Sequence, residues 1–378
     1  MAKQVVILGA GFAGIVTAHK LLKYTTPKIK SLKVILLSPN THFFWNPAAV
    51  RGVMPGEVPD DKLFTPIATG FAHYPKDNFG FVLGRAEGID VADNSVVARV
   101  GEGQTKIRYD ILVIATGSNV GTLPIKHLGD QNTMVTELHK LQEKVKAAKS
   151  IIVVGAGPTG VETTGELGAA YGGKKDITLI VQGDRILSFM RKDLSYNGES
   201  KLRKLGVQII HNVTVTETNE TRSQTAVKLS DGQTLTASLY LPLTGVQPNT
   251  SFLPGQWKDG NGNIKVDHHL KVEGMKNAYA IGDCSNLEGN HLFAIGAQIR
   301  YLAEELDAVL TGKHGAAKKY VVNPRIRHII TMGKKTGIGQ MGGWKIFGFL
   351  VAMRKGKTLF VESGPTLIEG KQLIGLKI

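Results

Sequence analysis

The residues best suited to carry chemistry lie in two glycine-rich turns. Residues 9–14 read GAGFAG and residues 155–160 read GAGPTG, each directly after an apolar run. In such a GxGxxG turn the first glycine permits the tight turn, the second lets the backbone approach a pyrophosphate, and the third allows close packing of helix on strand. The N–H groups that open the following helix bind the phosphates. The sequence therefore predicts two dinucleotide-binding sites in one chain.

Each turn needs a strand before it and a helix after it, and the flanking residues supply both. Residues 4–8 and 32–38 are typical of buried parallel strands on either side of a helix ending near residue 23. The run "SIIVV" and residues 176–182 flank a second helix, which Pro158 suits as its first residue. Further helices are expected at about 133–148, 193–205 and 291–312, and strands at about 106–118, 207–215 and 225–230.

The second strand–helix–strand unit is nested within the sequence of the first. This order predicts an α/β fold with two nested doubly wound, Rossmann-like dinucleotide domains plus a small C-terminal α+β domain. We expect a discontinuous first domain at 1–120 and 248–322, a second domain at 121–247, and the C-terminal domain at 323–378.

Cysteine content and hydropathy exclude several classes of site. Cys284 is the one cysteine among 378 residues, which excludes an intramolecular disulfide, a CxxC relay, and a cysteine-ligated zinc or iron–sulfur centre. The longest late apolar run, residues 346–353, is far shorter than the ~20 residues of a spanning helix. The N-terminus has no signal-peptide pattern. We therefore expect an intracellular protein with no transmembrane helix and no metal site.

The charge is strongly basic, with 46 lysines and arginines against 31 acidic residues and a net charge of +15. Three interpretations stay open. The cations are a solvated surface that attracts anionic dinucleotides, or they face an anionic membrane surface, or they bind nucleic acid. No motif of a nucleic-acid-binding module accompanies the charge. A homodimer is a further expectation that the sequence leaves open.

Two more motifs widen the pattern beyond the glycine turns. Residues 109–118 read "YDILVIATGS" and residues 279–286 read "YAIGDCSN". Together with the two turns, they resemble the two-dinucleotide flavoprotein oxidoreductases over essentially the whole chain. The tail "MGKKTGIGQMGGW…LVAMRKGKTLFVESG" is similar, more narrowly, to the ferroptosis-suppressor and apoptosis-inducing-factor-like family. Members of that family are FAD enzymes that pass electrons from NAD(P)H to ubiquinone-type acceptors.

The resemblance implies FAD on the first glycine turn and NADH or NADPH on the second. It implies Asp283 near the ribityl and pyrophosphate groups, residues 115–117 against the cofactor, Arg51 at a flavin-nucleotide contact and Ala86 beside the adenine. The predicted cofactor-binding residues are Gly9, Ala10, Gly11, Phe12, Ala13, Gly14, Ser38, Asn40, Arg51, Ala86, Ala115, Thr116, Gly117, Asp283, Gly155, Gly157, Pro158, Thr159, Gly160, Gln182, Arg185 and Gly245.

The ends of the second strands depart from the usual dinucleotide pattern. An acidic residue about 20 positions after the turn normally holds the ribose hydroxyls. The first unit has Ser38 and Asn40 there, so one of them is expected to take that role. The second unit has Gln182 and, slightly later, Arg185, which predicts use of both NADH and NADPH. Arg185 as a surface residue that caps the next helix is the alternative.

Three residues are predicted to act in catalysis. Glu162 lies in the first turn of the second helix, where a carboxylate is favoured by the dipole, and the resemblance directs it at the nicotinamide–flavin junction. Lys355 and Phe360 match tail positions that face the flavin in the family, as a proton donor and as the lining of an apolar quinone path. The alternatives are a routine helix glutamate and a solvated lysine.

A diffusible quinone is the predicted acceptor, because a chain without a dithiol cannot reduce glutathione- or thioredoxin-like substrates. Two alternatives remain open. One is an apoptosis-inducing-factor-like redox sensor with slow turnover and charge-driven nucleic-acid binding; the other is a reductase for an acidic partner protein such as a ferredoxin. Residue 2 is Ala2 instead of the glycine that N-myristoylation requires, so we expect no myristoyl anchor. We therefore expect a cytoplasmic protein, or one peripheral to a mitochondrial or lipid-droplet membrane through its basic surface and the apolar tail.

Overall fold

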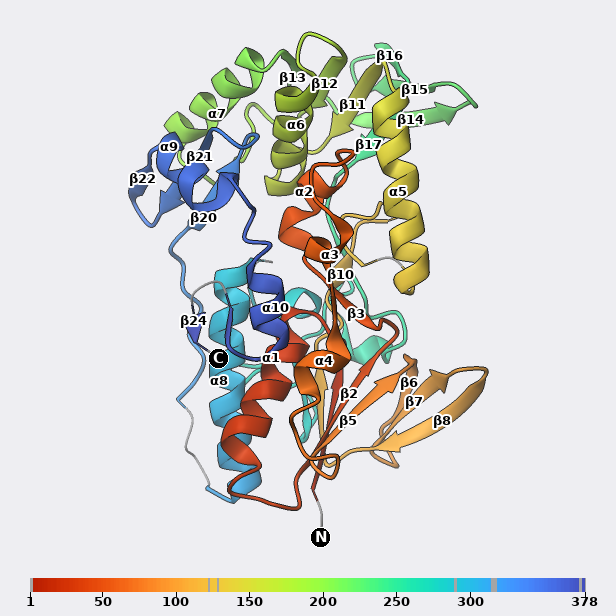
Figure 1. Cartoon of the computed structure of the whole chain (residues 1–378), viewed down its shortest axis with the longest axis vertical. Helices are drawn as coiled ribbons and strands as arrows, with labels where there is room; N and C mark the ends of the chain where they lie inside the picture. The colour runs from red at the N-terminus through yellow and green to blue at the C-terminus, as the bar shows by residue number, and fades with distance from the viewer. Residues whose placement is uncertain are drawn as a thin grey trace.

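The computed structural model describes residues 3–121, 123–127, 129–288, 291–313, 318–373 and 376–377. These residues form two lobes, each built on a parallel sheet, and the C-terminal residues run along both (Figure 1). We call the lobe that contains the N-terminal strand the first lobe and the other the second lobe. The predicted α/β class with two Rossmann-like sheets is confirmed.

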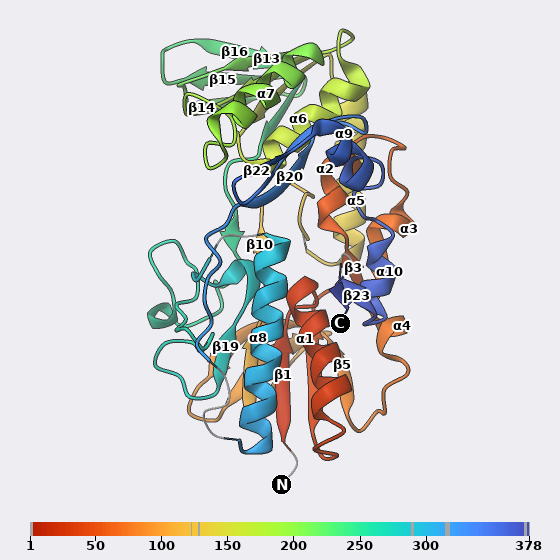
Figure 2. The ribbon, with the colours of Figure 1, turned by 90° about the vertical axis from the view of Figure 1, so that its left-hand side faces the viewer.

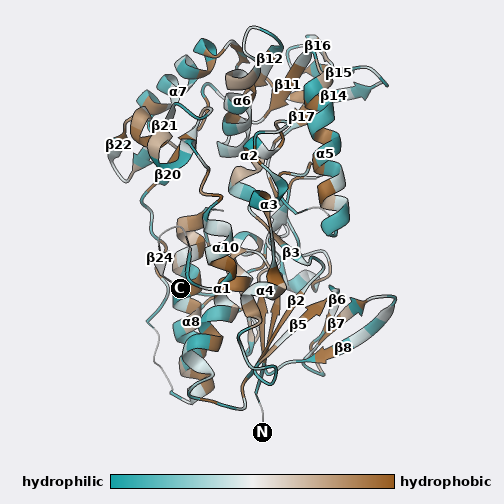
Figure 3. Ribbon diagram, viewed as in Figure 1, coloured by the Kyte–Doolittle hydropathy of each residue, from teal (hydrophilic) through white to brown (hydrophobic). Residues whose placement is uncertain are grey.

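The first lobe has a five-stranded sheet in the order β19-β9-β1-β2-β5, with every neighbouring pair parallel. Val5 and Ile7 pack into one core cluster and Val6 and Leu8 into another, because successive side chains point to opposite faces. Both faces are covered, so the strands are continuously apolar (Figure 3). The strands are β1 (Gln4–Leu8), β2 (Lys33–Ser38), β5 (Phe79–Leu83), β9 (Ile111–Ile114) and β19 (Ala278–Ala280).

Helices and a small antiparallel sheet cover the two faces. On one face α1 (Phe12–Lys20), prolonged by the π-helical turn η1 (Leu21–Thr25), packs beside α8 (Leu292–Thr311) (Figure 2). The other face is covered by three antiparallel strands and by a loop region that includes the 3-10 turn η3 (Gly255–Trp257). These three strands are β6 (Arg85–Asp90), β7 (Ser95–Val100) and β8 (Gly103–Arg108).

The second lobe has a four-stranded parallel sheet in the order β13-β12-β11-β17, with a three-stranded antiparallel sheet beyond it. The strands are β11 (Ser150–Val154), β12 (Asp176–Ile180), β13 (Val207–Ile210), β17 (Leu239–Pro242), β14 (Val215–Glu220), β15 (Thr225–Leu229) and β16 (Thr234–Ala237). The helices are α5 (Gln131–Ala147), α6 (Pro158–Tyr171) and α7 (Lys192–Lys204), close to the predicted ranges.

The strand predicted at 106–118 is wrong in one respect, since the structure divides it among three strands. β8 belongs to the antiparallel sheet, β9 to the parallel sheet, and β10 (Ser118–Asn119) pairs with β18 (Gln247–Pro248) where the chain passes between the lobes. The apolar residues are continuous in sequence, but the chain changes sheets at Tyr109 and Asp110. Hydropathy alone does not show such a change.

The segment between β2 and β5 extends from the first lobe toward the second (Figure 1). It pairs two short strands and carries several helical turns. Its elements are β3 (His42–Phe44), η2 (Asn46–Ala48), α2 (Ala49–Gly52), α3 (Asp60–Leu63), β4 (Phe64–Pro66) and α4 (Ile67–Phe71). Helix α2 contacts α6 of the second lobe, which brings Arg51 to the interface between the lobes.

The C-terminal residues pack on both lobes. The antiparallel strands β20 (Arg327–Thr331), β21 (Gly337–Met341) and β22 (Trp344–Ile346) lie on α6 and α7, and α9 (Gly348–Val351) and the π-helical turn η5 (Ala352–Gly356) follow. Helix α10 (Ser363–Ile368) instead packs on α1 and α4, followed by β23 (Gln372–Leu373) and β24 (Leu376–Lys377). The segment therefore connects the lobes, and the predicted domain boundaries stay predictions.

Candidate active site

The first glycine turn follows β1 and opens α1. Gly9 has φ +100°, and a Cβ built there would lie 2.5 Å from the Ala115 carbonyl oxygen. A Cβ at Gly14 would lie 1.9 Å from the Gly9 carbonyl oxygen, so both positions need glycine. Gly11 faces open space, and as the N-cap of α1 it has no side-chain cap. The helix N-terminus is therefore accessible to a phosphate, and the turn fits a dinucleotide.

The second turn, between β11 and α6, has the same geometry. Gly155 has φ +122°, and a Cβ there would lie 2.3 Å from the Leu243 carbonyl oxygen; at Gly160 it would lie 1.9 Å from the Gly155 oxygen. Gly157 again faces open space and caps α6 without a side chain, and Pro158 is the first helical residue. Two sites in the chain thus fit a pyrophosphate.

Ser38 and Asn40 lie at the end of β2, next to the first turn. The Ser38 hydroxyl accepts a hydrogen bond from the Asn40 backbone N–H at 3.2 Å. Asn40 is 7 % exposed, and its buried Oδ1 has no hydrogen-bond partner in the protein. A buried acceptor without a partner is uncommon, and a ribose hydroxyl of a bound dinucleotide would satisfy it. This supports the predicted role of Asn40 at the first site.

Asp283 lies in the 3-10 turn η4 (Gly282–Cys284), after β19. It accepts a hydrogen bond from the Ser118 hydroxyl at 2.8 Å and forms an ion pair with Lys126. The sequence analysis missed Lys126, because no motif distinguishes it from other loop lysines. Burial raises the pKa of the neighbouring Cys284 thiol to about 11, so this thiol stays protonated and unreactive at neutral pH.

Gln182 and Arg185 follow β12 in the second lobe. Gln182 is exposed, and the Arg185 guanidinium donates to the Ser188 carbonyl at 2.8 Å and to Asp184 at 3.2 Å. Its buried Nε has no partner in the protein. Arg185 therefore lies folded against its own loop, and its contact with a 2′-phosphate stays a prediction.

The remaining predicted cofactor residues line the turns and the crossing between the lobes. Gly117 and Gly245 have φ values of +66° and +74° and face open space, while Thr116 and Gly117 offer carbonyls that Asn249 binds. Ala86 lies in β6 of the small antiparallel sheet. Contacts of these residues with a cofactor also stay predictions. Four residues of the first turn are buried, namely Ala10, Phe12, Ala13 and Gly14.

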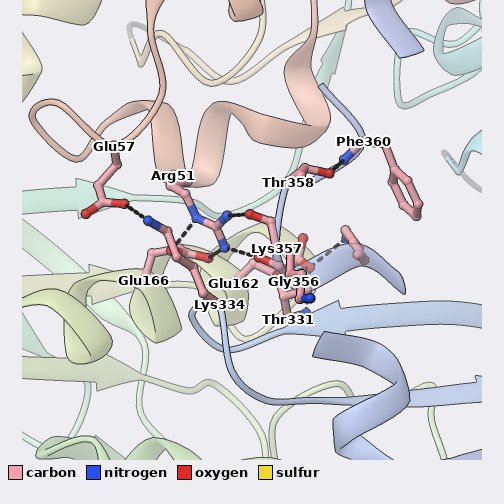
Figure 4. A network of polar contacts seen from close by, with 11 residues as sticks. Arg51, Glu57, Glu162, Glu166, Thr331, Lys334, Gly356, Lys357, Thr358 and Phe360 are labelled. Carbon is pink, nitrogen blue, oxygen red and sulfur yellow. Dashed lines mark hydrogen bonds and ion pairs between the residues drawn. The ribbon is translucent and has the colours of Figure 1, made fainter. Parts of the chain in front are cut away.

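The structure brings together two of the predicted catalytic residues, Glu162 of α6 and Lys355 of η5. Figure 4 shows Glu162 with its partner Thr331. Glu162 Oε1 accepts a hydrogen bond from Lys355 Nζ at 2.7 Å, and two more from the Thr331 backbone N–H and hydroxyl at 2.7 and 2.9 Å. Lys355 also donates to the Ile329 carbonyl at 3.0 Å. The Glu162 and Lys355 side chains are 8 % and 14 % exposed. The π-helical turn η5 thus holds a cation against helix α6, two residues beyond the second glycine turn.

One helical turn further along α6, Glu166 pairs with Arg51. The guanidinium makes two hydrogen bonds of 2.8 Å to the carboxylate and two more to the carbonyls of Gly356 and Lys357. Both side chains are almost fully buried, and burial raises the pKa of the Glu166 carboxyl although Arg51 opposes this. Arg51 is held by protein acceptors, so its expected contact with the flavin nucleotide stays a prediction.

Phe360, the third predicted catalytic residue, lies in an unusual backbone conformation. Leu359 and Phe360 have φ values of +51° and +58°, a region that residues with a Cβ rarely adopt. Leu359 is buried, and its carbonyl accepts a hydrogen bond from the buried Trp45 indole at 2.8 Å. This anchor holds the strained pair, and Figure 4 shows the Phe360 ring pointing away from the ion pairs.

Two histidines that the sequence analysis did not single out lie near Lys355. The rings of His291 and His328 are 5.2 Å apart, one from the N-cap of α8 and one from β20. Burial lowers the pKa of His328 to about 4, with smaller contributions from His291 and Lys355. His328 is therefore neutral at physiological pH.

A model of the pyridine nucleotide-disulphide oxidoreductase family matches residues 3–302. The chain is 40% identical over 374 residues to oxidoreductase ptaL of Pestalotiopsis fici, covering 98% of this chain and 100% of that protein. It is 28% identical over 377 residues to ferroptosis suppressor protein 1 of Homo sapiens, covering 96% and 95%. The solved structure of the sulfide:quinone oxidoreductase from Aquifex aeolicus superposes with a TM-score of 0.77 at 20% identity, covering 97% and 92%.

Proposed function

The chain belongs to the pyridine nucleotide-disulphide oxidoreductase family, and on this premise we propose that it is an NAD(P)H:quinone oxidoreductase. Its cofactors are FAD and a nicotinamide dinucleotide, and the resemblance to ferroptosis-suppressor and apoptosis-inducing-factor-like proteins is confirmed. Bound FAD supplies the two-electron chemistry that links NAD(P)H to the acceptor. The residues of the chain bind and orient the two dinucleotides and manage charge and protons around them.

The observation that carries the quinone is the buried Lys355–Glu162 pair in a chain whose one cysteine is buried and unreactive. A disulfide acceptor would need a dithiol, which the sequence lacks. Reduction of a quinone consumes two electrons and two protons; NAD(P)H provides a hydride, so one further proton must come from elsewhere. Lys355 Nζ gives this proton to a quinone oxygen, while Glu162 and the Ile329 carbonyl hold the ammonium group and Thr331 positions Glu162.

Phe360 and its anchor provide the apolar side of the same site. Since the Leu359 carbonyl accepts a hydrogen bond from Trp45, the backbone that carries Phe360 is anchored at the end of the segment that carries Lys355. A quinone ring can pack on this aromatic face. The sulfide:quinone oxidoreductase neighbour, which has the same fold, supports the same class of acceptor.

Gln182 and Arg185 support use of both nicotinamide dinucleotides. No carboxylate stands directly at the end of β12 to repel a 2′-phosphate, and Gln182 can donate to a ribose hydroxyl. Asp184 pairs with Arg185 and partly neutralises it. We therefore expect kcat/KM values for NADH and NADPH that differ by less than about tenfold, since neither a fixed acid nor a free arginine discriminates.

Stopped-flow spectroscopy of the FAD-loaded protein under anaerobic conditions tests the proposal. NADH is expected to bleach the flavin absorbance, and a short-chain ubiquinone added second is expected to restore it in a stoichiometric reaction. Bleached protein that a quinone fails to reoxidise would overturn the choice of acceptor. Protein that NADH fails to bleach would overturn the proposed donor as well. Ferredoxin and ferricyanide as acceptors separate the quinone from one-electron partners.

The redox-sensor alternative predicts a different result in the same experiment. There the reduced protein would keep a long-wavelength charge-transfer band with NAD+ for minutes, and quinone turnover would be negligible. The basic surface favours this reading only through its charge, so salt-sensitive DNA binding must accompany the slow turnover. Rapid reoxidation by quinone excludes it.

A further inference from the structure

Four large apolar side chains project from one edge of the C-terminal segment. Trp344, Phe347, Phe349 and Met353 are 82, 65, 67 and 61% exposed, and we call them the apolar edge. They belong to ten consecutive residues that form β22, α9 and the start of η5. The rings of Phe347 and Phe349 stack with their centroids 6.1 Å apart. Clustered exposure of this kind is uncommon on a protein surface and indicates an interaction site.

The support under the apolar edge is firmly packed. Val351 is fully buried, and Ile346 packs on Gly339, where a Cβ would lie 2.9 Å from the isoleucine. At Gly348 a Cβ would lie 2.9 Å from the Gly337 carbonyl oxygen. The chain therefore presents these four side chains outward from a fixed hairpin and helical turn. Figure 1 shows β22 and α9 on the outer side of the molecule, far from α5.

The charge of the chain is concentrated in the same segment. Residues 308–361 contain 11 lysines and arginines and no acidic residue, so they account for +11 of the net charge of +15. Beside the apolar edge, Lys335 and Arg354 are exposed. The acids that other elements bring to this area are already paired, Asp193 of α7 with Lys345 and Glu57 with Lys334. Lys335 and Arg354 form no ion pair with an acid of the described residues, so they leave positive charge beside the edge.

We propose that this face binds the surface of an anionic lipid bilayer, with the four apolar side chains inserted at the level of the headgroups and acyl chains. Tryptophan and phenylalanine beside lysine and arginine match the two parts of such an interface, because the rings enter the apolar boundary and the cations meet lipid phosphates. The contact is peripheral: no helix in the described part of the chain is long and apolar enough to cross a membrane. A nucleic acid would use the cations but leave the apolar edge exposed to water.

The position of the edge also connects it to the candidate active site. Met353 and Lys355 lie in the same π-helical turn, Met353 exposed at the surface and Lys355 directed inward to Glu162. On the proposed function, a quinone dissolved in the bilayer would reach the site beside this turn. The membrane contact itself does not depend on that function, and binding can be measured without turnover.

Vesicle flotation of the FAD-loaded full chain tests the contact, with phosphatidylcholine vesicles that contain or lack phosphatidylglycerol. We expect flotation with the anionic vesicles that high salt weakens. Trp344 gives a second readout, since Trp45 and Trp257 are buried and the chain has three tryptophans. Brominated lipids are expected to quench its emission and to shift the remainder to shorter wavelength. No flotation and no quenching would overturn the proposal.

Surface variants locate the contact. Replacement of all four residues of the apolar edge by serine is expected to lower partition at least about tenfold. Lys335→Glu with Arg354→Glu is expected to lower it at least about 25-fold, since each of the two cations lost near an anionic surface accounts for about fivefold. The matched controls lie on other faces, Val91→Ser with Val100→Ser for apolar exposure and Lys144→Glu with Lys149→Glu for charge; neither is expected to change partition.

Two other outcomes would replace the proposal. Salt-sensitive binding to duplex DNA, lost in Lys335→Glu/Arg354→Glu and without vesicle flotation, would identify a nucleic-acid surface. A dimer in analytical ultracentrifugation that the serine variant dissociates, again without flotation, would identify a contact between copies of the chain. Turnover with a water-soluble short-chain quinone is measured in parallel, so a failure of membrane binding is distinguished from a failure of the proposed reaction.

Discussion

Helix α6 carries two buried acid–base pairs one turn apart, and they differ in what they can do (Figure 4). Glu166 is held by Arg51 through two parallel hydrogen bonds, and the remaining Arg51 donors are bound by two backbone carbonyls. Glu162 receives Lys355 and Thr331 on the single oxygen Oε1. An arginine in a protein does not give up its proton, whereas a lysine can. The first pair therefore fastens the lobes together, and the second remains available for proton chemistry.

The largest expected effect is on quinone turnover when the Glu162–Lys355 pair is changed. Lys355→Met is expected to slow quinone reduction by about 10²–10⁴-fold, the range for loss of a positioned proton donor. Single-turnover spectroscopy should place the loss in the reoxidation of the flavin by quinone, with its reduction by NADH changed less. Lys355→Arg keeps the ion pair but not the transferable proton, so it should stay slow. Full activity in the arginine variant would reduce Lys355 to a positioning residue.

The next largest effect is on the free energy of unfolding when the Arg51–Glu166 pair is changed. Arg51→Met leaves the Glu166 carboxylate buried without its partner, which should cost about 3–5 kcal/mol in the free energy of unfolding. Arg51→Met with Glu166→Leu removes both charges and should recover most of that loss, since an apolar pair needs no compensation. Urea unfolding followed by tryptophan fluorescence measures both. If Arg51→Met costs under about 1 kcal/mol, the pair is not what joins the lobes.

The two pairs on α6 also show which features of the site the sequence alone could not predict. The glycine turns and their strands were predictable because their signals are local: Gly9 and Gly155 must have positive φ, and the apolar runs before them are buried on both faces. Glu162 and Lys355 were predicted separately, each from a motif. Their pairing was not, because 193 positions separate them and nothing in the sequence distinguishes Lys355 from the nearby tail lysines.

Arg51 shows the same limit in a different form. Its motif indicated a nucleotide contact. In the structure, however, Glu166 and the backbone carbonyls of Gly356 and Lys357 bind the Arg51 guanidinium. That arrangement depends on the packing of α2 on α6, a tertiary contact with no local signature. Lys126 and Thr331 were missed for the same reason. Local motifs thus located the elements of the site, and long-range packing determined which side chains meet.

A third, smaller effect concerns the other end of the C-terminal segment. There His19 of α1 holds the segment with a neutral ring, Nε2 at 2.8 Å from the Ile368 carbonyl and Nδ1 at 2.9 Å from the Tyr74 hydroxyl. Burial lowers the pKa of His19 from 6.5 to about 4, so the unfolded chain takes up the proton first as the pH falls. The free energy of unfolding should therefore fall between pH 6.5 and 4, by up to ~1.4 kcal/mol per pH unit.

Replacement of His19 isolates this contribution. His127 and His328 also have pKa values lowered to about 4, so they destabilise the fold in the same pH range. Urea titrations at pH 7, 6, 5 and 4 give the slope of the free energy of unfolding against pH. The difference in this slope between the wild type and His19→Gln is the contribution of His19. Equal slopes in the two proteins would show that the His19 imidazole titrates normally in the folded protein.

The smallest effect is expected at the third pair of the network, Lys334 with Glu57. Like the Arg51–Glu166 pair it starts from the segment between β2 and β5, but it reaches the turn between β20 and β21 instead of α6, and it lies at the surface. The side chains are 54 and 37% exposed, with Nζ and Oε2 2.6 Å apart. Water screens such a pair, and ordering two flexible side chains offsets much of the attraction, so Lys334→Ala should cost no more than ~1 kcal/mol and less in high salt. Lys334→Ala and Arg51→Met measured side by side in urea compare two pairs that both start from the segment between β2 and β5, one buried and one exposed. A loss at Lys334 as large as that at Arg51 would mean that charge between the segments, rather than burial of the arginine, is what holds the lobes together.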